Sequence, residues 1–152
     1  MERQLPTAAR TLEGFLANPQ YRVAVVKSFK HGAAYDAWLD QLRAQNRVEE
    51  VGDQETVFNL LKNGRVQAML AVPTTYTPFL RQTAMAERFS VLDLAASSKP
   101  VLAGLVLSRA RVPDHAVKMM EKHLLAMRRD GTLERIYRRY MDAQVAREMV
   151  RF

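Results

Sequence analysis

The chain has 152 residues, 48% hydrophobic and 26% charged, a composition typical of a globular protein with one domain-sized core. It has no cysteine and no apolar run long enough to cross a membrane, which excludes disulfides, thiolate metal sites and a membrane-spanning helix. The formal net charge of +7 raises the question of whether the partner is nucleic acid or a membrane.

The excess positive charge is concentrated in the last third of the sequence. Residues 109–152 hold 11 Lys and Arg against 6 Asp and Glu, whereas residues 1–108 hold 12 against 10. A basic helical segment can bind nucleic-acid phosphates, and this is the alternative function for the chain. Acidic residues are interspersed, however, and no zinc-finger, basic-zipper or RNA-binding aromatic pattern is present, so the pattern favours a solvated helix surface.

The first half of the chain alternates predicted helices and strands. Strands are predicted where β-branched or apolar residues form short runs, and helices where apolar residues recur every three or four positions. The predicted order is a short helix capped by Thr11, a strand at 21–26, a helix from Ala33 to about Asn46, an edge strand at 47–51, a helix at 53–63 closed by Gly64, and a strand at 66–71. This β-α-β-α-β order predicts an α/β fold with an open, mainly parallel sheet and helices on both faces.

The second half is predicted to hold two more strands and several helices. A helical segment should run from the Pro73–Pro78 region through Arg81, with strands at 89–94 and 101–107. A helix capped by Asp114 follows, and its apolar face is Ala116, Met120, Leu124 and Met127. Asp130-Gly131 should separate it from a helix striped by Leu133, Ile136, Tyr137, Tyr140 and Met141, and residues 143–152 should form a helical tail.

No catalytic or metal-binding motif is present in the sequence. His31, His115 and His123 form no His-x-x-x-His pair and lack carboxylates at ligand spacing, so we expect no metal and no cofactor. Phosphate loops, dinucleotide fingerprints and nucleophile elbows are also absent. Asp36 and Asp40 lie one helical turn apart, a spacing that an exposed helix face produces equally well. We therefore expect that the chain is not an enzyme.

Two predicted loops follow the carboxyl ends of strands, where open parallel sheets bind ligands. After the first strand, Lys27-Ser-Phe-Lys-His-Gly-Ala-Ala34 leads into a helix whose N-terminus offers backbone N–H groups to a carboxylate or phosphate. After the third strand come two hydroxyls and an aromatic ring. The alternatives are an ordinary turn with solvated lysines and a helix N-cap by Thr74 or Thr75. The candidate ligand-binding residues are Lys27, Ser28, His31, Gly32, Ala33, Ala34, Thr74, Thr75 and Tyr76.

Four stretches of sequence carry a family resemblance in a consistent order. They are residues 22–26, the Gly32-Ala-Ala-Tyr35 and Trp38-Leu39 segment, residues 57–61 with Gly64-Arg-Val-Gln-Ala68, and Arg129-Asp-Gly-Thr-Leu133 with Ile136-Tyr137 and Tyr140. Together they resemble the extracytoplasmic solute-binding proteins of ABC importers, in the amino-acid-binding family with the type II periplasmic-binding fold. The resemblance covers roughly residues 11–141.

This resemblance implies a two-lobed protein that closes on a small molecule in a cleft between the lobes and delivers it to the membrane subunits of an importer. By this comparison residues 1–11 are an N-terminal extension, 12–99 the second lobe, 100–141 a crossing strand and return helices of the first lobe, and 142–152 a tail. Hinge strands are expected near 93–107. The first part of lobe one has no counterpart, so the chain resembles a truncated form. The implied location is the periplasm.

Departures from the family pattern bear on the ligand. The family commonly has Ser or Thr after the glycine that opens the first helix of this lobe, and an aspartate for the α-ammonium at the end of the third strand; this chain has Ala33 and Val72 there. Losing a charged partner such as this aspartate costs about 2–5 kcal/mol of binding free energy. The expected ligand is therefore a small polar molecule, amino-acid-like or anionic, bound weakly. The apolar stripes of the return helices, if exposed, predict self-association into a homo-oligomer.

Overall fold

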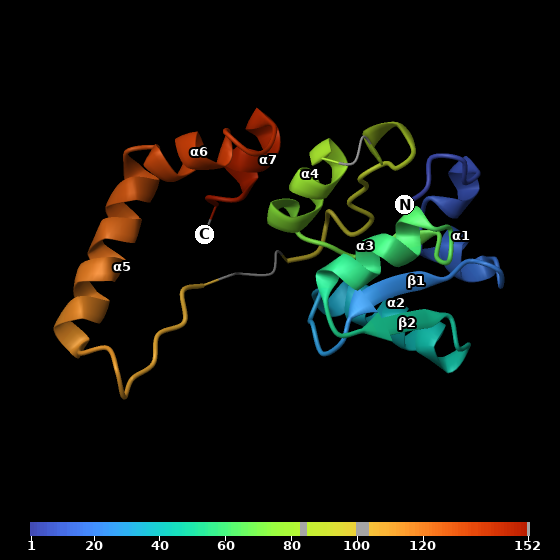
Figure 1. Cartoon of the computed structure of the whole chain (residues 1–152), viewed down its shortest axis with the longest axis horizontal. Coiled ribbons are helices and arrows are strands. Elements are labelled where there is room, and N and C mark those ends of the chain that lie inside the picture. The colour runs from blue at the N-terminus through green and yellow to red at the C-terminus, as the bar shows by residue number, and fades with distance from the viewer. Residues whose placement is uncertain (83–84, 100–103, 152) are drawn as a thin grey trace. The chain divides into compact units, whose positions relative to one another are not determined.

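A computed structural model describes residues 1–82, 85–99 and 104–151 of the chain (Figure 1). The chain forms two compact units, Met1–Val101 and Leu102–Phe152, and each is described separately. Among the described residues, no helix combines the length and apolar character needed to cross a bilayer.

The first unit is built on a small open sheet of three parallel strands, β1 (Val23–Val26), β2 (Val48–Val51) and β3 (Ala68–Met69). Their spatial order is β2-β1-β3, with Val23 opposite Val48 on one side and Ala68 on the other. The α/β prediction is confirmed at this level, and β2 is an edge strand as predicted. The third strand is shorter than expected, because only two of its residues pair with β1.

Helices connect the strands in the predicted order. Thr11 caps α1 (Leu12–Ala17), its side chain accepting a hydrogen bond from the Gly14 backbone, and Asp53 caps α3 (Gln54–Lys62) in the same way. The other elements of this unit are η1 (Thr7–Ala9), α2 (Ala33–Ala44), α4 (Pro73–Gln82) and η2 (Met85–Glu87). Gly64 follows α3 with φ of +68°, the left-handed conformation predicted for the end of that helix.

Hydrophobic side chains pack on both faces of the sheet. On one face α1 and α2 contribute Phe15, Trp38, Leu39 and Leu42 to a cluster with Val23 and Val25. On the other face Val57 and Leu61 of α3 pack with Ala24 and Val26. The segment predicted as an N-terminal extension contributes Leu5 and Ala9 to the first cluster. Helices therefore cover both faces, as the alternating order predicts.

The guanidinium of Arg47 is buried in the first unit, next to the C-terminal end of α1. Its side chain donates hydrogen bonds to the carbonyl oxygens of Phe15, Leu16, Asn18 and Tyr21, and to the side chain of Gln45. Arg47 is only 3% exposed. Because the last carbonyls of a helix lack partners within the helix, a cation with several donors both satisfies them and interacts favourably with the helix dipole. Arg47 thus joins α1 to the start of β2.

The strand predicted at 89–94 is not formed. Phe89 makes an isolated antiparallel bridge to Glu2, and residues 90–94 adopt no strand. Backbone groups of Met1 and Arg3 bond to Ser90 and Arg88, so the pairing partner is the N-terminal segment and it covers only a few residues. Val91 and Leu92 are exposed. The apolar pattern was a misleading signal there, because a strand needs a neighbour along its whole length.

The strand predicted at 101–107, and with it the hinge strands near 93–107, is not borne out in the described residues. Residues 100–103 lie outside the described part of the chain, and 104–107 have no regular structure. Leu105 and Val106 are exposed, Val106 at 91%. An apolar run of this kind forms a strand only where a sheet edge accepts its backbone hydrogen bonds.

The second unit consists of three helices, α5 (Asp114–Arg129), α6 (Thr132–Tyr137) and α7 (Ala143–Glu148). The predicted boundary at Asp130-Gly131 is confirmed, and α6 is shorter than expected. Asp114 does not cap α5: the N-cap is Pro113, which has no side-chain hydrogen-bonding group, and Asp114 is the first helical residue. An aspartate in the first turn still interacts favourably with the positive end of the helix dipole.

Candidate functional site

The strand order places the two candidate loops at one point of the sheet. The chain leaves β1 for β2 on one side and later adds β3 on the other side, parallel to β1. The loops after β1 and β3, both selected from sequence, therefore start at the same carboxyl edge of the sheet, on neighbouring strands. Ligands of open α/β sheets bind at this edge.

The loop after β1 is shaped by two residues with positive φ. Ser28 has φ of +67°, and Gly32, the N-cap of α2, has φ of +92° and ψ of 157°. That conformation is accessible essentially to glycine alone, and a glycine has no side chain with which to cap the helix. Lys27, Phe29 and Lys30 are exposed between the two turns. The N-terminus of α2 is thus left to backbone N–H groups, Ala33 being exposed and Ala34 half-buried.

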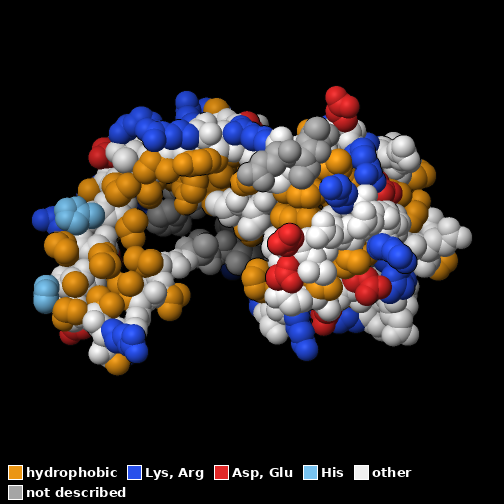
Figure 2. Space-filling model, viewed as in Figure 1, with side chains coloured by type: hydrophobic (Ala, Val, Ile, Leu, Met, Phe, Trp, Pro, Cys, Tyr) orange, Lys and Arg blue, Asp and Glu red, His pale blue; other side chains and the backbone are white. Residues whose placement is uncertain are grey.

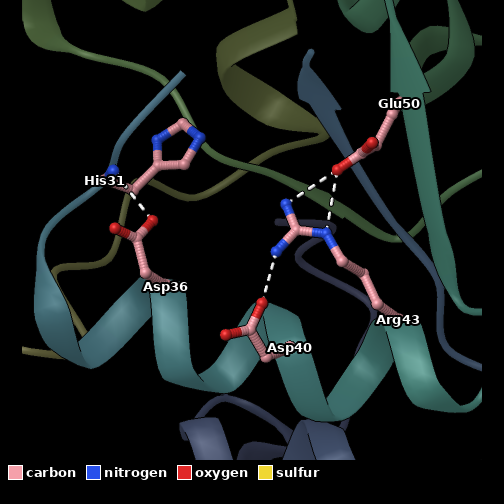
Figure 3. Close-up of polar contacts among 5 residues, drawn as sticks. All are labelled: His31, Asp36, Asp40, Arg43 and Glu50. Carbon is pink, nitrogen blue, oxygen red and sulfur yellow. Dashed lines mark hydrogen bonds and ion pairs between the residues drawn. The ribbon is translucent and has the colours of Figure 1, made fainter. Parts of the chain in front are cut away.

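His31 lies at the end of this loop, half-buried. Its backbone N–H donates to Asp36 Oδ1 at 3.1 Å, while the imidazole is directed away from that carboxylate (Figure 3). The Nε2 atom is buried and has no hydrogen-bond partner among the described residues. Burial lowers the pKa of His31 below its ordinary value of 6.5, Asp36 opposes that effect, and Arg43 adds to it. A neutral imidazole with an unused nitrogen can donate to or accept from a ligand.

Asp36 and Asp40 share a face of α2, as their spacing predicts, but they have different partners. Arg43 bonds to Asp40 Oδ1 at 2.7 Å and to Glu50 of β2 at 2.7 Å, forming a bridge between helix and strand (Figure 3). Asp36 instead accepts from the His31 backbone. The two carboxylates therefore hold local structure, and the observed contacts agree with the structural interpretation of this pair.

The loop after β3 leads directly into α4, which begins at Pro73. The Thr75 hydroxyl donates to the Val72 carbonyl at 2.8 Å, so it is engaged within its own turn. Thr74 is exposed and Tyr76 is half-buried. Of the two threonines proposed from sequence, Thr74 is therefore the exposed one.

A third segment reaches the start of α2 and was missed by sequence reasoning. The Tyr35 hydroxyl donates to Asp93 Oδ1 at 3.1 Å and accepts from the Leu94 backbone N–H at 2.9 Å. Burial raises the pKa of Tyr35, and the neighbouring Asp93 raises it further. The residues are 58 positions apart and no local signal links them. The pairing anchors residues 93–94 beside the first turn of α2.

The candidate site residues line neither of the two cavities described below, and no metal-binding cluster is found among the described residues. One cavity of about 520 Å³ lies beside η1 and α1, lined by Pro6, Gly14, Pro19 and their neighbours, and a shallow one of about 310 Å³ lies on α5. Neither is lined by the candidate loops. In the described residues there is no group of three or more His, Asp or Glu arranged to hold a metal ion.

Comparison with known proteins found no match: no family model, no curated protein sequence and no solved structure was similar to the chain. The interpretation of the site therefore rests on its own geometry.

The depressed pKa of His31 predicts an acid-sensitive contribution to stability. Because the unfolded histidine takes up a proton near pH 6.5 and the folded one only at lower pH, protons favour unfolding between those two values. The free energy of unfolding should fall as pH drops through this window, and His31→Gln should lose that part of the pH dependence. Denaturant titrations at a series of pH values measure it. An NMR titration giving His31 a pKa above 6.5 would contradict the assignment.

Proposed function

We propose that the chain is a solute-binding module, the second lobe and part of the first lobe of an extracytoplasmic binding protein of an ABC importer, with a type II periplasmic-binding fold. The observation that carries the proposal is the parallel pairing of β1 and β3, which brings the loops after these two strands to one carboxyl edge of the sheet. The β1-α2-β2-α3-β3 order agrees with the motif order on which the family resemblance depends.

The chemistry of the loop after β1 favours an anionic or carboxylate-bearing ligand. The uncapped N-terminus of α2 presents backbone N–H groups and the positive end of its dipole. Lys27 and Lys30 add positive charge, and the free Nε2 of His31 adds a hydrogen-bonding group. Asp36 in the first turn and Asp93 beside it oppose this charge, and the contact of Asp36 with the His31 backbone holds the loop.

These loops contain no carboxylate to pair with an α-ammonium group. Val72, at the end of the third strand, is exposed and apolar. A ligand held by its carboxylate alone binds weakly, so we expect millimolar affinity or weaker, on the scale of about 4 kcal/mol.

Backbone NMR of the full chain, titrated with succinate and L-glutamate, tests the proposal. Chemical-shift changes should be centred on the amides of Gly32, Ala33 and Ala34, and glycinamide, which lacks a carboxylate, should cause none. Lys27→Glu should weaken binding about fivefold, because one reversed charge beside an exposed anion is worth about 1 kcal/mol. Lys62→Glu, the same change on α3, is the matched control. Saturating carboxylate without shifts at these amides would refute the proposal.

A further inference from the structure

In the part that the structure describes, the second unit exposes seven large apolar side chains and buries few hydrophobic ones. Within the described residues 104–151, only Met141 and Ala146 are buried hydrophobics. The exposed large apolar residues of this unit are Leu105, Val106, Met119, Met120, Leu124, Ile136 and Tyr140. A globular unit that exposes this many large apolar groups has a surface suited to a partner.

Helix α5 is strongly amphipathic. At 100° per residue, Met120, Leu124 and Met127 fall on one face, and Lys118, Lys122 and Arg129 fall on the opposite one. Its overall hydrophobicity is low despite this separation. A large separation of apolar and charged faces combined with low overall hydrophobicity distinguishes a helix lying at a membrane interface from one buried in a protein core.

The segment after α5 also separates apolar from cationic side chains, over a shorter length. Ile136 and Tyr140 lie on one side of α6 and its continuation, and Arg135, Arg138 and Arg139 lie on the other, all of them exposed. Figure 2 shows Lys and Arg side chains gathered over the α6–α7 part of this unit, with hydrophobic side chains directly beside them. Both α5 and α6 therefore carry apolar and cationic side chains.

The net positive charge of this unit favours an anionic partner. Residues 102–152 hold 11 Lys and Arg and 6 Asp and Glu. Four of these six acidic groups are engaged locally: Glu134 pairs with Arg138, Glu148 accepts from the Gln144 side chain, and Asp130 and Asp142 accept hydrogen bonds from the backbone N–H groups of Thr132 and Val145. A second copy would bring the same positive excess to the interface, whereas an anionic surface complements it.

The cavity on α5 lies on the charged side of the helix, beside Lys118 and Lys122, and not on the side of Met120 and Leu124. An amphipathic helix at a bilayer interface needs an apolar face and an opposite polar face rich in Lys and Arg, and α5 has both.

We propose that the α5–α6 surface docks on anionic lipid bilayers. The apolar residues Met120, Leu124, Ile136 and Tyr140 enter the boundary between headgroups and acyl chains, and Arg135, Arg138 and Arg139 lie near lipid phosphates. The unit lies on the membrane without crossing it. This inference is independent of the proposed ligand-binding function.

Co-sedimentation of the full chain with vesicles tests the proposal. Binding should be strong on phosphatidylcholine vesicles that contain phosphatidylglycerol, at least about tenfold weaker on pure phosphatidylcholine, and weaker at high salt. The double variant Met120→Glu/Leu124→Glu should abolish binding, and Val91→Glu/Leu92→Glu, which changes two exposed apolar residues of the first unit, should not. Unchanged helical circular dichroism verifies that each variant folds.

The charge requirement is tested separately. Arg138→Gln/Arg139→Gln should weaken binding to the anionic vesicles at least about tenfold, and Lys27→Gln/Lys30→Gln, in the first unit, should leave it unchanged. Equal binding to neutral and anionic vesicles would overturn the proposal. The proposal would also be overturned if the chain did not bind vesicles and instead formed a stable dimer that Met120→Glu/Leu124→Glu disrupts. The same holds if the chain did not bind vesicles and instead bound DNA in a salt-dependent manner.

Discussion

Replacing Arg47 by methionine is expected to lower the free energy of unfolding of the first unit by about 3–5 kcal/mol. Methionine fills much of the space but removes every donor to the carbonyls of Phe15, Leu16, Asn18 and Tyr21. Those carbonyls lie around a residue that is 3% exposed, so water does not readily replace the guanidinium. The end of α1 would lose both its hydrogen bonds and its favourable charge.

Urea denaturation followed by tryptophan fluorescence measures this loss, because Trp38 is the single tryptophan and is buried in the same cluster as Phe15. Arg43→Met is the matched control. Arg43 forms ion pairs with Asp40 and Glu50, but its side chain is 40% exposed, so its loss should cost no more than about 1 kcal/mol. Equal effects of the two substitutions would mean that Arg47 does not hold α1 in place.

Replacing Gly14 by alanine is expected to destabilise the first unit by about 2–3 kcal/mol. In an ordinary helix this change stabilises by about 1 kcal/mol, since alanine is the better helix former. Here a Cβ at position 14 would overlap the backbone carbonyl of Ala8, which belongs to η1. Backbone atoms cannot move aside as a flexible side chain can, so α1 and η1 would have to separate and expose Phe15 and Ala9 to water.

The same tryptophan-monitored denaturation gives the result for this variant. Gly52→Ala is the control, because a Cβ at Gly52 would meet no atom within 4 Å, and its effect should stay within about 0.5 kcal/mol. A Gly14→Ala variant as stable as the parent chain would show that η1 does not rest on α1 as the structure places it.

Local signals predicted the first half of the fold well. The alternation of strands and amphipathic helices, the cap at Thr11, the helix start at Asp53 and the left-handed Gly64 each depend on residues within a few positions of one another. Such features are encoded in short windows, where side-chain periodicity and capping chemistry act directly. The same signals failed at 89–94 and at 104–107, because an apolar run becomes a strand only where a neighbouring strand is available.

The candidate site was predicted in part. The sequence located both loops, since strand ends and glycine-opened helices are visible locally. It could not show that the Thr75 hydroxyl is engaged by Val72, or that Tyr35 pairs with Asp93 from a distant segment. It also gave no indication that Arg47, a charged residue at the start of a strand, is buried among carbonyl groups. Those contacts join parts of the chain that only tertiary packing brings together.

By itself the sequence determined the α/β class, the order of the elements up to β3, the two loops at the carboxyl ends of β1 and β3 and the positive excess of the last third. The tertiary structure alone decided the β2-β1-β3 order that brings those loops to neighbouring strands at one edge of the sheet. It also decided the burial of Arg47 and the exposure of the apolar stripe on α5 and α6. Periodicity shows which face of an element is apolar, but whether that face is covered depends on the atoms that other segments place against it.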